Sequence, residues 1–454
     1  MERIILDDCL DAPLYIQIYK YYKTEISQGR LKEGNKLPSI RQLTMDLKVS
    51  KTTVEAAYNQ LVVEGYVNNL PKRGYYVVSL NDSYFHTNAY QDIAMEKEVN
   101  KTFINNGVDK NSFDMKSWRK LYSYILQTTN DAVYTGGDEQ GELFLRNNIS
   151  AFVQKTRGVN CNPGQIIVGA GVQYLLGILC SLLKEDIHHI ALEYPGFKQA
   201  ENVFQNYGMH TLPIPVNEDG IDIELLKKSN AELVYISPSH QYPTGSIMPI
   251  NKRIQILNWA KENNATIIED DYDGLIRYET RPIPALQGLS NGKHVIYFGS
   301  FSKLLLPSIR ISYMILPEDI LQRYVKHRSR YAQSASKLEQ LTLGQFMQEG
   351  YFEKHLRKIK KIYHRKNEMI IDFIHQHAEN KIKILGHDSG LHMMFEVTSE
   401  KSTQDILFSA KTLNIYLEAV EGYNKSKPLI VFTYSGIQEN EINNVLRMLL
   451  RIID

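Results

Sequence analysis

The sequence of 454 residues predicts an α/β protein with at least two domains. From about residue 101 onward, short apolar segments such as QIIVGA and HVIYFGS alternate with amphipathic segments. This alternation predicts a mainly parallel sheet with helices on both faces. Residues 1–79 instead hold short helical patterns that end in the alternating segment GYYVV, which predicts a small separate domain.

The composition is that of an ordinary globular chain. Apolar residues make up 43% of the sequence and charged residues 23%, and 52 basic residues balance 51 acidic ones. No overall field therefore favours a nucleic-acid or membrane partner, so any basic patch must be local. The N-terminus has acidic residues where a signal peptide needs an apolar core, and no apolar run could span a bilayer. These features predict a cytoplasmic protein without a membrane partner.

The cysteines predict neither disulfides nor a metal site. There are three of them, Cys9, Cys161 and Cys180, an odd number with wide spacing. No Cys-x-x-Cys pair occurs, so the ligand pattern of a zinc site is missing.

Residues 1–79 have the pattern of a winged helix-turn-helix. Ser39 can cap the helix IRQLTMDLK, and Ser50 can cap the helix KTTVEAAYNQLVVEGY after the tight turn VS. The segment NNLPKRGYYVV then predicts a β-hairpin wing with Lys72 and Arg73 at its tip. Such a fold places the second helix in the major groove of DNA.

Basic side chains gather around the turn, the start of the second helix and the wing. The short donors Thr52 and Thr53 at the helix start suit base edges and phosphates. The alternative interpretation is a helical cap or dimerisation segment with solvated charges. The basic residues concerned are Lys36, Arg41, Lys48, Lys51, Lys72 and Arg73.

The segments PLYIQI, GNKLPSIRQL, SKTTVEAAYNQL and EGY follow one another in an order that resembles the winged-helix domain of GntR-type repressors. That family usually has arginine where this chain has Lys51. Lysine lacks the fork that pairs with one guanine, so we expect a different site preference. The resemblance implies that the residues in contact with a double-stranded DNA operator are Arg41, Ser50, Lys51, Thr52, Thr53 and Arg73.

Residues 80–100 are polar and weakly periodic, which predicts a linker. The expected domains are therefore residues 1–79 and residues 101–454.

A lysine follows one of the apolar segments of the large domain. Lys303 comes after VIYFGSFS, which reads as a buried strand. A lysine in a sheltered site at a strand end can lose its proton and form an imine with an aldehyde. Pyridoxal phosphate (PLP) is such an aldehyde, and it also needs an anion cradle, an acid near its pyridine nitrogen and a surface for its ring. The alternative is a solvated surface lysine.

Each of these requirements has a candidate in the sequence. Backbone N–H groups at Gly171 and Val172 open a helix and could hold an anion, together with Ser300, Ser302 and Arg310. TIIEDDYDG offers carboxylates at a strand end, and EYPGF offers an aromatic ring after a turn. Taken singly, these segments are more typical of a packing turn, a solvated turn and a core aromatic. SPSHQYPTG alone reads as a polar turn with a possible cis-proline.

The blocks FDMKSW, YTGGDEQGELFLR, EYPGF, SPSHQYPTG, EDDYD and SFSKLLLPSIR resemble, in this order, aminotransferases of PLP fold type I. With its N-terminal domain, the whole chain resembles MocR/GabR-type transcriptional regulators. By that resemblance Lys303 forms the imine with PLP, and Asp270 pairs with the pyridine nitrogen. The D-x-Y spacing favours Asp270 over Asp271 and brings Tyr272 to the ring hydroxyl. The residues implied around the phosphate are Gly171, Val172, Ser300, Ser302 and Arg310.

The same resemblance implies further contacts and a homodimer. Phe197 would stack on the cofactor ring, and Tyr134 would reach the site of the neighbouring subunit. A symmetric dimer would suit repeated half-sites in the DNA operator.

Two departures from the aminotransferase pattern affect the expected function. Tyr242 stands where the enzymes carry an asparagine that contacts the ring hydroxyl. Ile430 and Val431 stand where the enzymes hold the substrate carboxylate with an arginine, and Gln199 replaces the alternative arginine of GABA-sensing relatives. An amino acid carboxylate therefore has no obvious forked partner.

The sequence predicts a transcriptional regulator that senses a small amine, an amino acid derivative or PLP itself, with little physiological turnover. The alternative is an active aminotransferase that transfers an amino group to a 2-oxo acid, with Lys303 and Asp270 as its catalytic pair; the missing arginine disfavours it. A third interpretation, a DNA-binding protein that never binds PLP, is disfavoured by the intact lysine, aspartate and arginine.

Overall fold

The computed structural model describes residues 4, 6–7, 12–79, 105, 107–128, 133–278, 283–386, 390–420 and 427–454. The chain forms two compact units, residues 1–100 and residues 101–454. The predicted linker, residues 80–100, lies outside the described residues.

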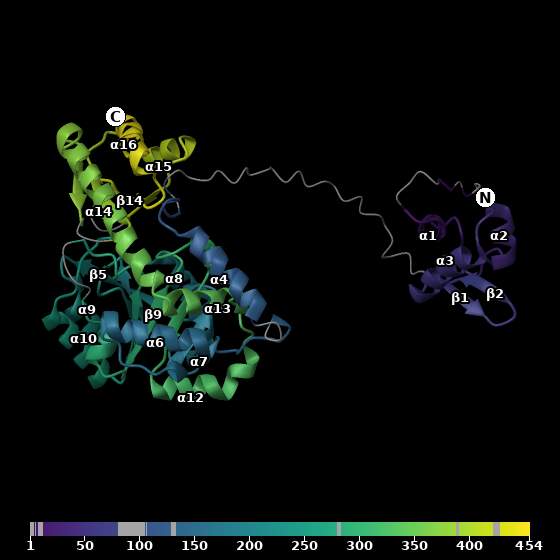
Figure 1. The fold of residues 1–454 in the computed structure, drawn as a ribbon, viewed down its shortest axis with the longest axis horizontal. Coiled ribbons are helices and arrows are strands. Elements are labelled where there is room, and N and C mark those ends of the chain that lie inside the picture. Colours follow the sequence, from purple (N-terminus) through teal and green to yellow (C-terminus); the bar gives the residue numbers. More distant parts are fainter. Residues whose placement is uncertain are drawn as a thin grey trace. The chain divides into compact units, whose positions relative to one another are not determined.

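The described residues of the N-terminal unit form three helices and a hairpin, which Figure 1 labels. Its two strands pair antiparallel, with Val67 opposite Val77. The predicted helix-turn-helix and wing are therefore both present. The elements are α1 (Leu14–Ser27), α2 (Ile40–Leu47), α3 (Lys51–Val63), β1 (Val67–Leu70) and β2 (Gly74–Val77).

Local chemistry fixes the ends of the two helices of the motif. Ser39 Oγ accepts a hydrogen bond from the N–H of Gln42 at 3.1 Å at the start of α2. Ser50 Oγ accepts one from the N–H of Thr53 at 3.1 Å at the start of α3. Each cap satisfies a backbone donor that the first turn of a helix leaves unpaired. Both predicted caps are confirmed.

The core of this unit forms around α3. Val54, Tyr58 and Leu61 are fully buried and pack against apolar side chains of α1, α2 and the hairpin. The buried hydroxyl of Tyr58 donates to the carbonyl oxygen of Pro38 at 3.0 Å, so its polar end is satisfied. This bond ties the segment before α2 to α3.

The large unit is built on an eight-stranded sheet with the order β3-β10-β9-β8-β7-β4-β5-β6. Strands β9, β8, β7, β4 and β5 run parallel, whereas β10 and β6 are antiparallel to their neighbours. The prediction of a mainly parallel sheet is confirmed. The strands are β3 (Ile166–Gly169), β4 (His189–Tyr194), β5 (His210–Asn217), β6 (Gly220–Ile221), β7 (Leu233–Ile236), β8 (Thr266–Asp271), β9 (Val295–Ser300) and β10 (Ser312–Ile315).

Helices cover both faces of this sheet (Figure 1). Ile296 and Phe298 of β9 pack towards α7, α8 and α12, whereas Val295 and Tyr297 pack towards the opposite layer with α6, α10 and α11. This alternation is the two-residue period of a strand. The helices are α4 (Met115–Thr128), α6 (Leu143–Arg157), α7 (Val172–Leu183), α8 (Lys198–Asn206), α9 (Ile223–Lys228), α10 (Ile250–Glu262), α11 (Leu286–Leu289), α12 (Glu318–His327) and α13 (Lys337–Gln348).

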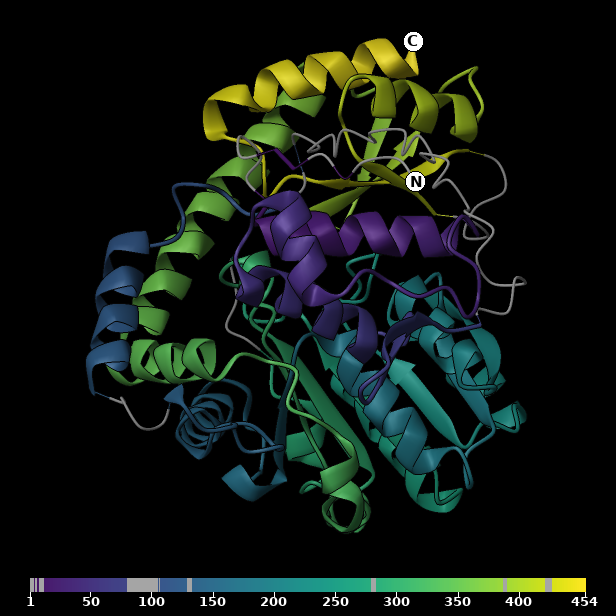
Figure 2. The ribbon, with the colours of Figure 1, turned by 90° about the vertical axis from the view of Figure 1, so that its right-hand side faces the viewer.

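A second, four-stranded antiparallel sheet with the order β11-β12-β14-β13 completes the unit. Helices α15 and α16 cover one face of it (Figure 2). One hydrophobic cluster runs along the long helix α14 from α6 and α13 to this small sheet, so the two sheets share a core. The elements are α14 (Tyr351–His377), β11 (Ile382–Leu385), β12 (His392–Val397), α15 (Thr403–Thr412), β13 (Leu417–Ala419), β14 (Leu429–Thr433) and α16 (Ile442–Ile453).

Across the part of the chain that the structure describes, no helix combines the length and the apolar character that crossing a bilayer requires.

Candidate functional site

The side chains predicted to meet DNA are largely open to solvent. Arg41 lies on α2, Lys51 on the first turn of α3, and Arg73 at the tip of the wing, and all three are exposed. Thr52 is exposed and Thr53 is half-buried. Lys51 forms only a surface ion pair of 3.1 Å with Glu55. Such a pair is weak in water, so the ammonium stays available for a phosphate.

Ser50, which was predicted to contact DNA, also stabilises the start of α3. Its hydroxyl caps α3 and lies 2.8 Å from the hydroxyl of Thr52 and 2.7 Å from that of Thr53. These three hydroxyls form one cluster at the helix start. Ser50 therefore orients the first turn of α3, and its contact with DNA stays a prediction.

In the large unit, predicted site residues lie at the ends of neighbouring strands. β7, β8 and β9 are adjacent and parallel, so their carboxyl ends meet at one edge of the sheet. Ligands of open α/β sheets bind at this edge. Asp270 lies at the end of β8 and Lys303 follows β9, which brings the two residues to the same edge.

Asp270 is a buried carboxyl with one unpaired oxygen. Its Oδ2 accepts a short hydrogen bond from the hydroxyl of Tyr235 on β7, whereas its Oδ1 has no hydrogen-bond partner among the described residues. Burial raises the pKa of Asp270 to about 7, and the carboxylates of Asp271 and Asp273 add to that rise. Asp270 is therefore suited to a buried proton donor, such as a protonated ring nitrogen.

Asp271 serves a different purpose. Its Oδ2 lies 2.6 Å from Nε of the buried Arg157 and accepts a hydrogen bond from the hydroxyl of Tyr297 at 2.5 Å. Asp271 also has a buried unpaired oxygen, Oδ1, but its charge is already compensated by the guanidinium. The choice of Asp270 over Asp271 therefore rests on charge, because Asp270 has no cation paired with it in the described structure.

Gly171 and Arg310 form an anion cradle at the start of α7. Gly171 has φ +106° and precedes Val172, the first residue of that helix. A Cβ atom on Gly171 would lie only 2.6 Å from Nη2 of Arg310, which donates to the carbonyl oxygen of Ala170 at 3.2 Å. The N–H of Gly171 already donates to the carbonyl oxygen of Gly169 at 2.9 Å. A guanidinium thus lies against the N-terminus of a helix, which is an arrangement that favours phosphate.

The two serines near Lys303 differ in their bonding. Ser300 Oγ lies 2.9 Å from Ser312 Oγ and accepts a weak hydrogen bond from the N–H of Ser302. The hydroxyl of Ser302 is buried and has no partner in the described structure. An unpaired buried hydroxyl beside the site is expected to bond to a ligand.

The side chain of Lys303 is exposed to solvent, whereas the sequence predicted a sheltered lysine. Desolvation by the surrounding protein atoms lowers the pKa of Lys303, and the carboxylates of Asp273 and Glu418 oppose this shift. A lowered pKa leaves more of the amine neutral, which is the form that attacks an aldehyde.

A histidine that the sequence analysis did not single out lies beside Tyr272. His240 Nδ1 is 2.9 Å from both carboxylate oxygens of Asp273 and 3.2 Å from the hydroxyl of Tyr272. Both His240 and Asp273 are buried. The pair holds the Tyr272 side chain in place. The last acid of EDDYD and the histidine of SPSHQYPTG were visible in the sequence, but nothing local showed that they meet.

A cavity of about 480 Å³ is lined by Tyr235, the hydrogen-bond partner of Asp270. Of the residues predicted to bind the cofactor, Phe197 alone is among its lining residues. The near-parallel rings of Phe197 and Tyr235, whose centroids are 6.5 Å apart, form part of its wall. Tyr242, which precedes a cis peptide bond to Pro243, lines it as well. We call this space the site cavity; it is lined by residues 192–198, Glu201, Thr211, Pro213, Tyr235, residues 242–243, residues 418–420 and Val431.

The remaining predicted positions fall in three places. Val431 on β14 faces the site cavity, whereas its neighbour Ile430 is fully buried in the main core. Gln199 is exposed on the first turn of α8. Tyr134 is 90% exposed before α6, and its contact with a second subunit stays a prediction.

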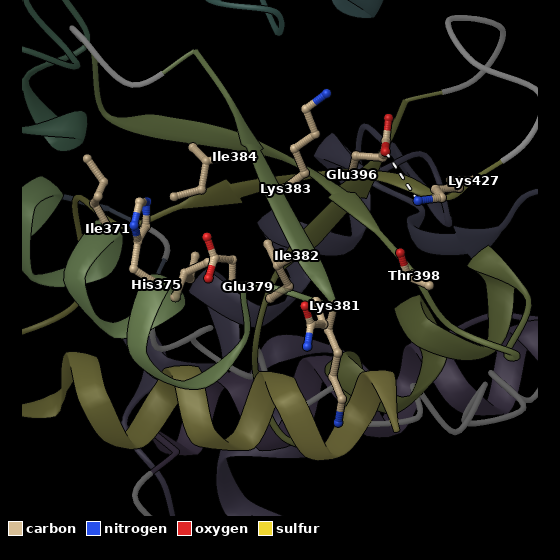
Figure 3. A pocket seen from close by; sticks show the side chains of 12 residues that line it. Ile371, His375, Glu379, Lys381, Ile382, Lys383, Ile384, Glu396, Thr398 and Lys427 are labelled. Carbon is tan, nitrogen blue, oxygen red and sulfur yellow. Dashed lines mark ion pairs between the residues drawn. The ribbon is translucent and has the colours of Figure 1, made fainter.

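A second cavity, of about 440 Å³, lies between the end of α14 and strands β11 and β12 (Figure 3). Charges of both signs line it, and Lys427 pairs with Glu396 at 3.6 Å. No residue predicted to bind cofactor or DNA lines this cavity, so we assign it no part in the site.

Comparisons with known proteins match both units. Residues 103–449 match the family described as aminotransferase class I and II, and residues 14–77 match the bacterial regulatory proteins of the gntR family. The uncharacterised HTH-type transcriptional regulator YdeL of Bacillus subtilis is 38% identical, over 98% of this chain and 97% of its own. The probable rhizopine catabolism regulatory protein MocR of Rhizobium meliloti is 29% identical, over 87% of this chain and 84% of its own.

Among solved structures, the kynurenine aminotransferase of Pyrococcus horikoshii matches with a TM-score of 0.69. It is 21% identical, and the match covers 78% of this chain and 91% of that one. At this identity the similarity shows the aminotransferase fold alone.

The raised pKa of Asp270 predicts a pH-dependent stability. Its folded-state pKa of about 7 lies above the value of 3.8 for a free aspartate. The stability that the neutral carboxyl contributes is therefore complete below about pH 4 and lost as pH rises through about 7. Relative to Asp270→Asn, the PLP-free wild type should lose on the order of a few kcal/mol of unfolding free energy over this range. Urea unfolding at several pH values, followed by tryptophan fluorescence, measures the difference, because Trp118 and Trp259 both lie in the large unit.

Asp222→Asn is the matched control. The N–H of Leu225 lowers the pKa of Asp222, so the contribution of this carboxylate is complete above about pH 4. The difference between wild type and this variant should stay flat from pH 5 to 8. If the difference in unfolding free energy between wild type and Asp270→Asn were also independent of pH, Asp270 would not be a carboxyl that titrates near neutrality.

Proposed function

This chain belongs to the MocR-type HTH transcriptional regulators, in which a gntR-family domain is joined to an aminotransferase class I and II domain, and on this premise we propose that it regulates transcription through PLP bound at Lys303. One observation carries the proposal. An unpaired buried carboxylate oxygen, a lysine of lowered pKa and an anion cradle all lie at strand ends and helix starts of an aminotransferase fold.

The residues present fit PLP. Asp270 Oδ1 would receive the protonated pyridine nitrogen, and the unpaired hydroxyl of Ser302 would donate to the phosphate. Arg310 at the N-terminus of α7 would supply the charge that a phosphate requires, and the N–H of Val172 would add a donor. The N–H of Gly171 would join it only on leaving the carbonyl oxygen of Gly169, to which it donates at 2.9 Å. When bound, PLP supplies an aldehyde and an electron-withdrawing ring.

The chain's own residues have distinct tasks in this proposal. Lys303 provides the amine that holds the cofactor covalently. Asp270 keeps a proton on the ring nitrogen, and Tyr235 orients that carboxyl through its hydrogen bond. His240 and Asp273 hold Tyr272 towards the site.

The signal is proposed to be a small amine, an amino acid derivative or PLP itself. A ligand shifts the DNA-binding state only if it binds the two conformational states unequally. An active aminotransferase is the second candidate, since Lys303 and Asp270 are its catalytic pair. The apolar Val431 and the polar but uncharged Gln199, at the positions of the expected arginines, argue against efficient turnover of amino acids.

The proposed assembly is a homodimer that acts on a double-stranded operator in the cytoplasm. The exposed Tyr134 would reach the site of the partner subunit. A two-fold axis would match repeated half-sites.

Lys303→Ala tests the proposed cofactor. Wild-type protein incubated with PLP and freed of excess should show a visible absorbance band, and Lys303→Ala should lack it, because Lys303 is the amine proposed to hold the cofactor. Lys198→Ala is the control, since this exposed lysine also lies by the site cavity but pairs with Glu201 at 2.6 Å. A colourless wild type, or a band retained in Lys303→Ala, would refute the proposal.

Gly171→Ala tests the anion cradle. The new Cβ would displace the Arg310 guanidinium, so the dissociation constant for PLP should rise at least about tenfold, the loss expected for one charge-assisted hydrogen bond. Gly208→Ala is the matched control. Gly208 has φ +78°, but its new methyl group would meet no atom within 4 Å, so this variant shares only the backbone strain. Equal affinities in the two variants would exclude Arg310 from the phosphate site.

Arg41→Ala and Lys51→Ala test the DNA-binding face. Each should weaken binding to a duplex that the wild type selects from a random pool by roughly fivefold to tenfold. Each lost phosphate contact should also reduce the slope of log affinity against log salt by about 1. Lys20→Ala is the control, because Lys20 is exposed on α1, outside the helix-turn-helix and the wing. Unchanged affinity and slope in both test variants would show that this face does not meet DNA.

A further inference from the structure

The wall of the site cavity carries an acid next to the position where a carboxylate-binding arginine was expected. Glu418 on β13 pairs directly with Val431 on β14. Side chains of directly paired residues in antiparallel strands point to the same face of the sheet, and both residues line the cavity. The carboxyl group of Glu418 therefore lies beside the position at which the aminotransferase pattern has an arginine.

The charge of Glu418 is not cancelled by its surroundings. Its Oε2 accepts a hydrogen bond of 2.6 Å from the hydroxyl of Tyr242, a neutral donor. In the described part of the chain it has no ion pair. Lys198 and Glu201 also line the cavity, and their charges compensate each other in an ion pair of 2.6 Å.

The remaining acid of the cavity adds little charge at neutral pH. Burial raises the pKa of Glu193 to about 8, so this carboxyl is largely protonated. Among the described residues, no arginine lines the cavity. The site cavity therefore carries one net negative charge, located on Glu418.

Glu418 also lies within electrostatic reach of Lys303, whose pKa it raises. Apolar and aromatic groups such as Val431, Phe197 and Pro195 line the site cavity together with Glu418, whereas Lys303 is not among its lining residues. Apolar walls beside an acid, within electrostatic reach of an amine-binding lysine, suit a methylene chain that carries nitrogen at both ends.

We propose that the site cavity binds an aliphatic diamine, with one nitrogen directed towards Lys303 and the second, cationic nitrogen paired with Glu418. The inference rests on the proposed function, since it names the class of small amine to which the regulator responds. A diamine gains the ion pair with Glu418, a monoamine lacks it, and the carboxylate of an amino acid is repelled at that position.

The experiment compares three ligands of similar length on the PLP-loaded full chain: putrescine, butylamine and γ-aminobutyrate. Spectral change of the bound PLP and affinity for the selected duplex are measured together. Putrescine should act at about tenfold lower concentration than butylamine, and γ-aminobutyrate should be the weakest. Glu418→Gln, which can still accept the Tyr242 hydrogen bond, should erase the preference for putrescine while leaving PLP uptake unchanged.

Glu396→Gln is the matched control. Glu396 lies on β12 of the same small sheet but lines the second cavity shown in Figure 3. This variant should keep the wild-type order of ligands. Equal responses of the wild type to putrescine and butylamine would by themselves overturn the inference. A preference for putrescine that persists in Glu418→Gln would overturn it as well.

The proposed function and the diamine proposal can fail independently. If the wild type takes up no PLP, the proposed regulation through PLP is refuted. Calorimetry of the PLP-free chain with the same three ligands then tests the cavity alone. There too, putrescine must bind tighter than butylamine in the wild type and not in Glu418→Gln for the inference to stand.

Discussion

The buried ion pair between Arg157 and Asp271 is the interaction on which the proposed cofactor site depends. The Arg157 guanidinium bonds to Asp271 on β8, to Ser239 in the loop after β7 and to the carbonyl oxygen of Ile283. Removing one partner of such a buried pair typically costs about 3–5 kcal/mol. By compensating Asp271, the pair leaves Asp270 as the carboxyl with an unneutralised charge, and it fixes the loop that carries His240 and Tyr242.

Two kinds of buried polar group lie at this edge of the sheet. The charges of Asp271 and Arg157 compensate each other and hold the scaffold, although Asp271 Oδ1 itself is unpaired. Asp270 Oδ1 and Ser302 Oγ are buried without partners in the described structure, and Asp270 has no such cation beside it. Buried polar atoms without a protein partner are commonly completed by water, an ion or a ligand. The unpaired atoms and the cradle of Gly171 and Arg310 thus mark the intended ligand more directly than the cavity does.

Much of the fold and of the site could be predicted from sequence because the signals are local. Ser39 and Ser50 cap helices through contacts three residues apart, and apolar runs such as IIVG in β3 reveal buried strands. Lys303, Arg310 and Gly171 stood out because each lies near a strand end or a helix start. The sequence could not show that His240 meets Asp273, or that Glu418 meets Tyr242, because these partners are brought together only by sheet packing.

By itself, the sequence determined the order of domains, the helix-turn-helix with its wing, the mainly parallel sheet and the residue types suited to PLP. Those features depend on periodicity, caps and short motifs, which need only neighbouring residues. Only the tertiary structure decided which of two adjacent aspartates stays unneutralised and which charge faces the site cavity. The second outcome depends on strand register: Glu418 faces the cavity beside Val431 because the two residues pair, and a shift of one residue would have placed Leu417 or Ala419 opposite Val431 instead.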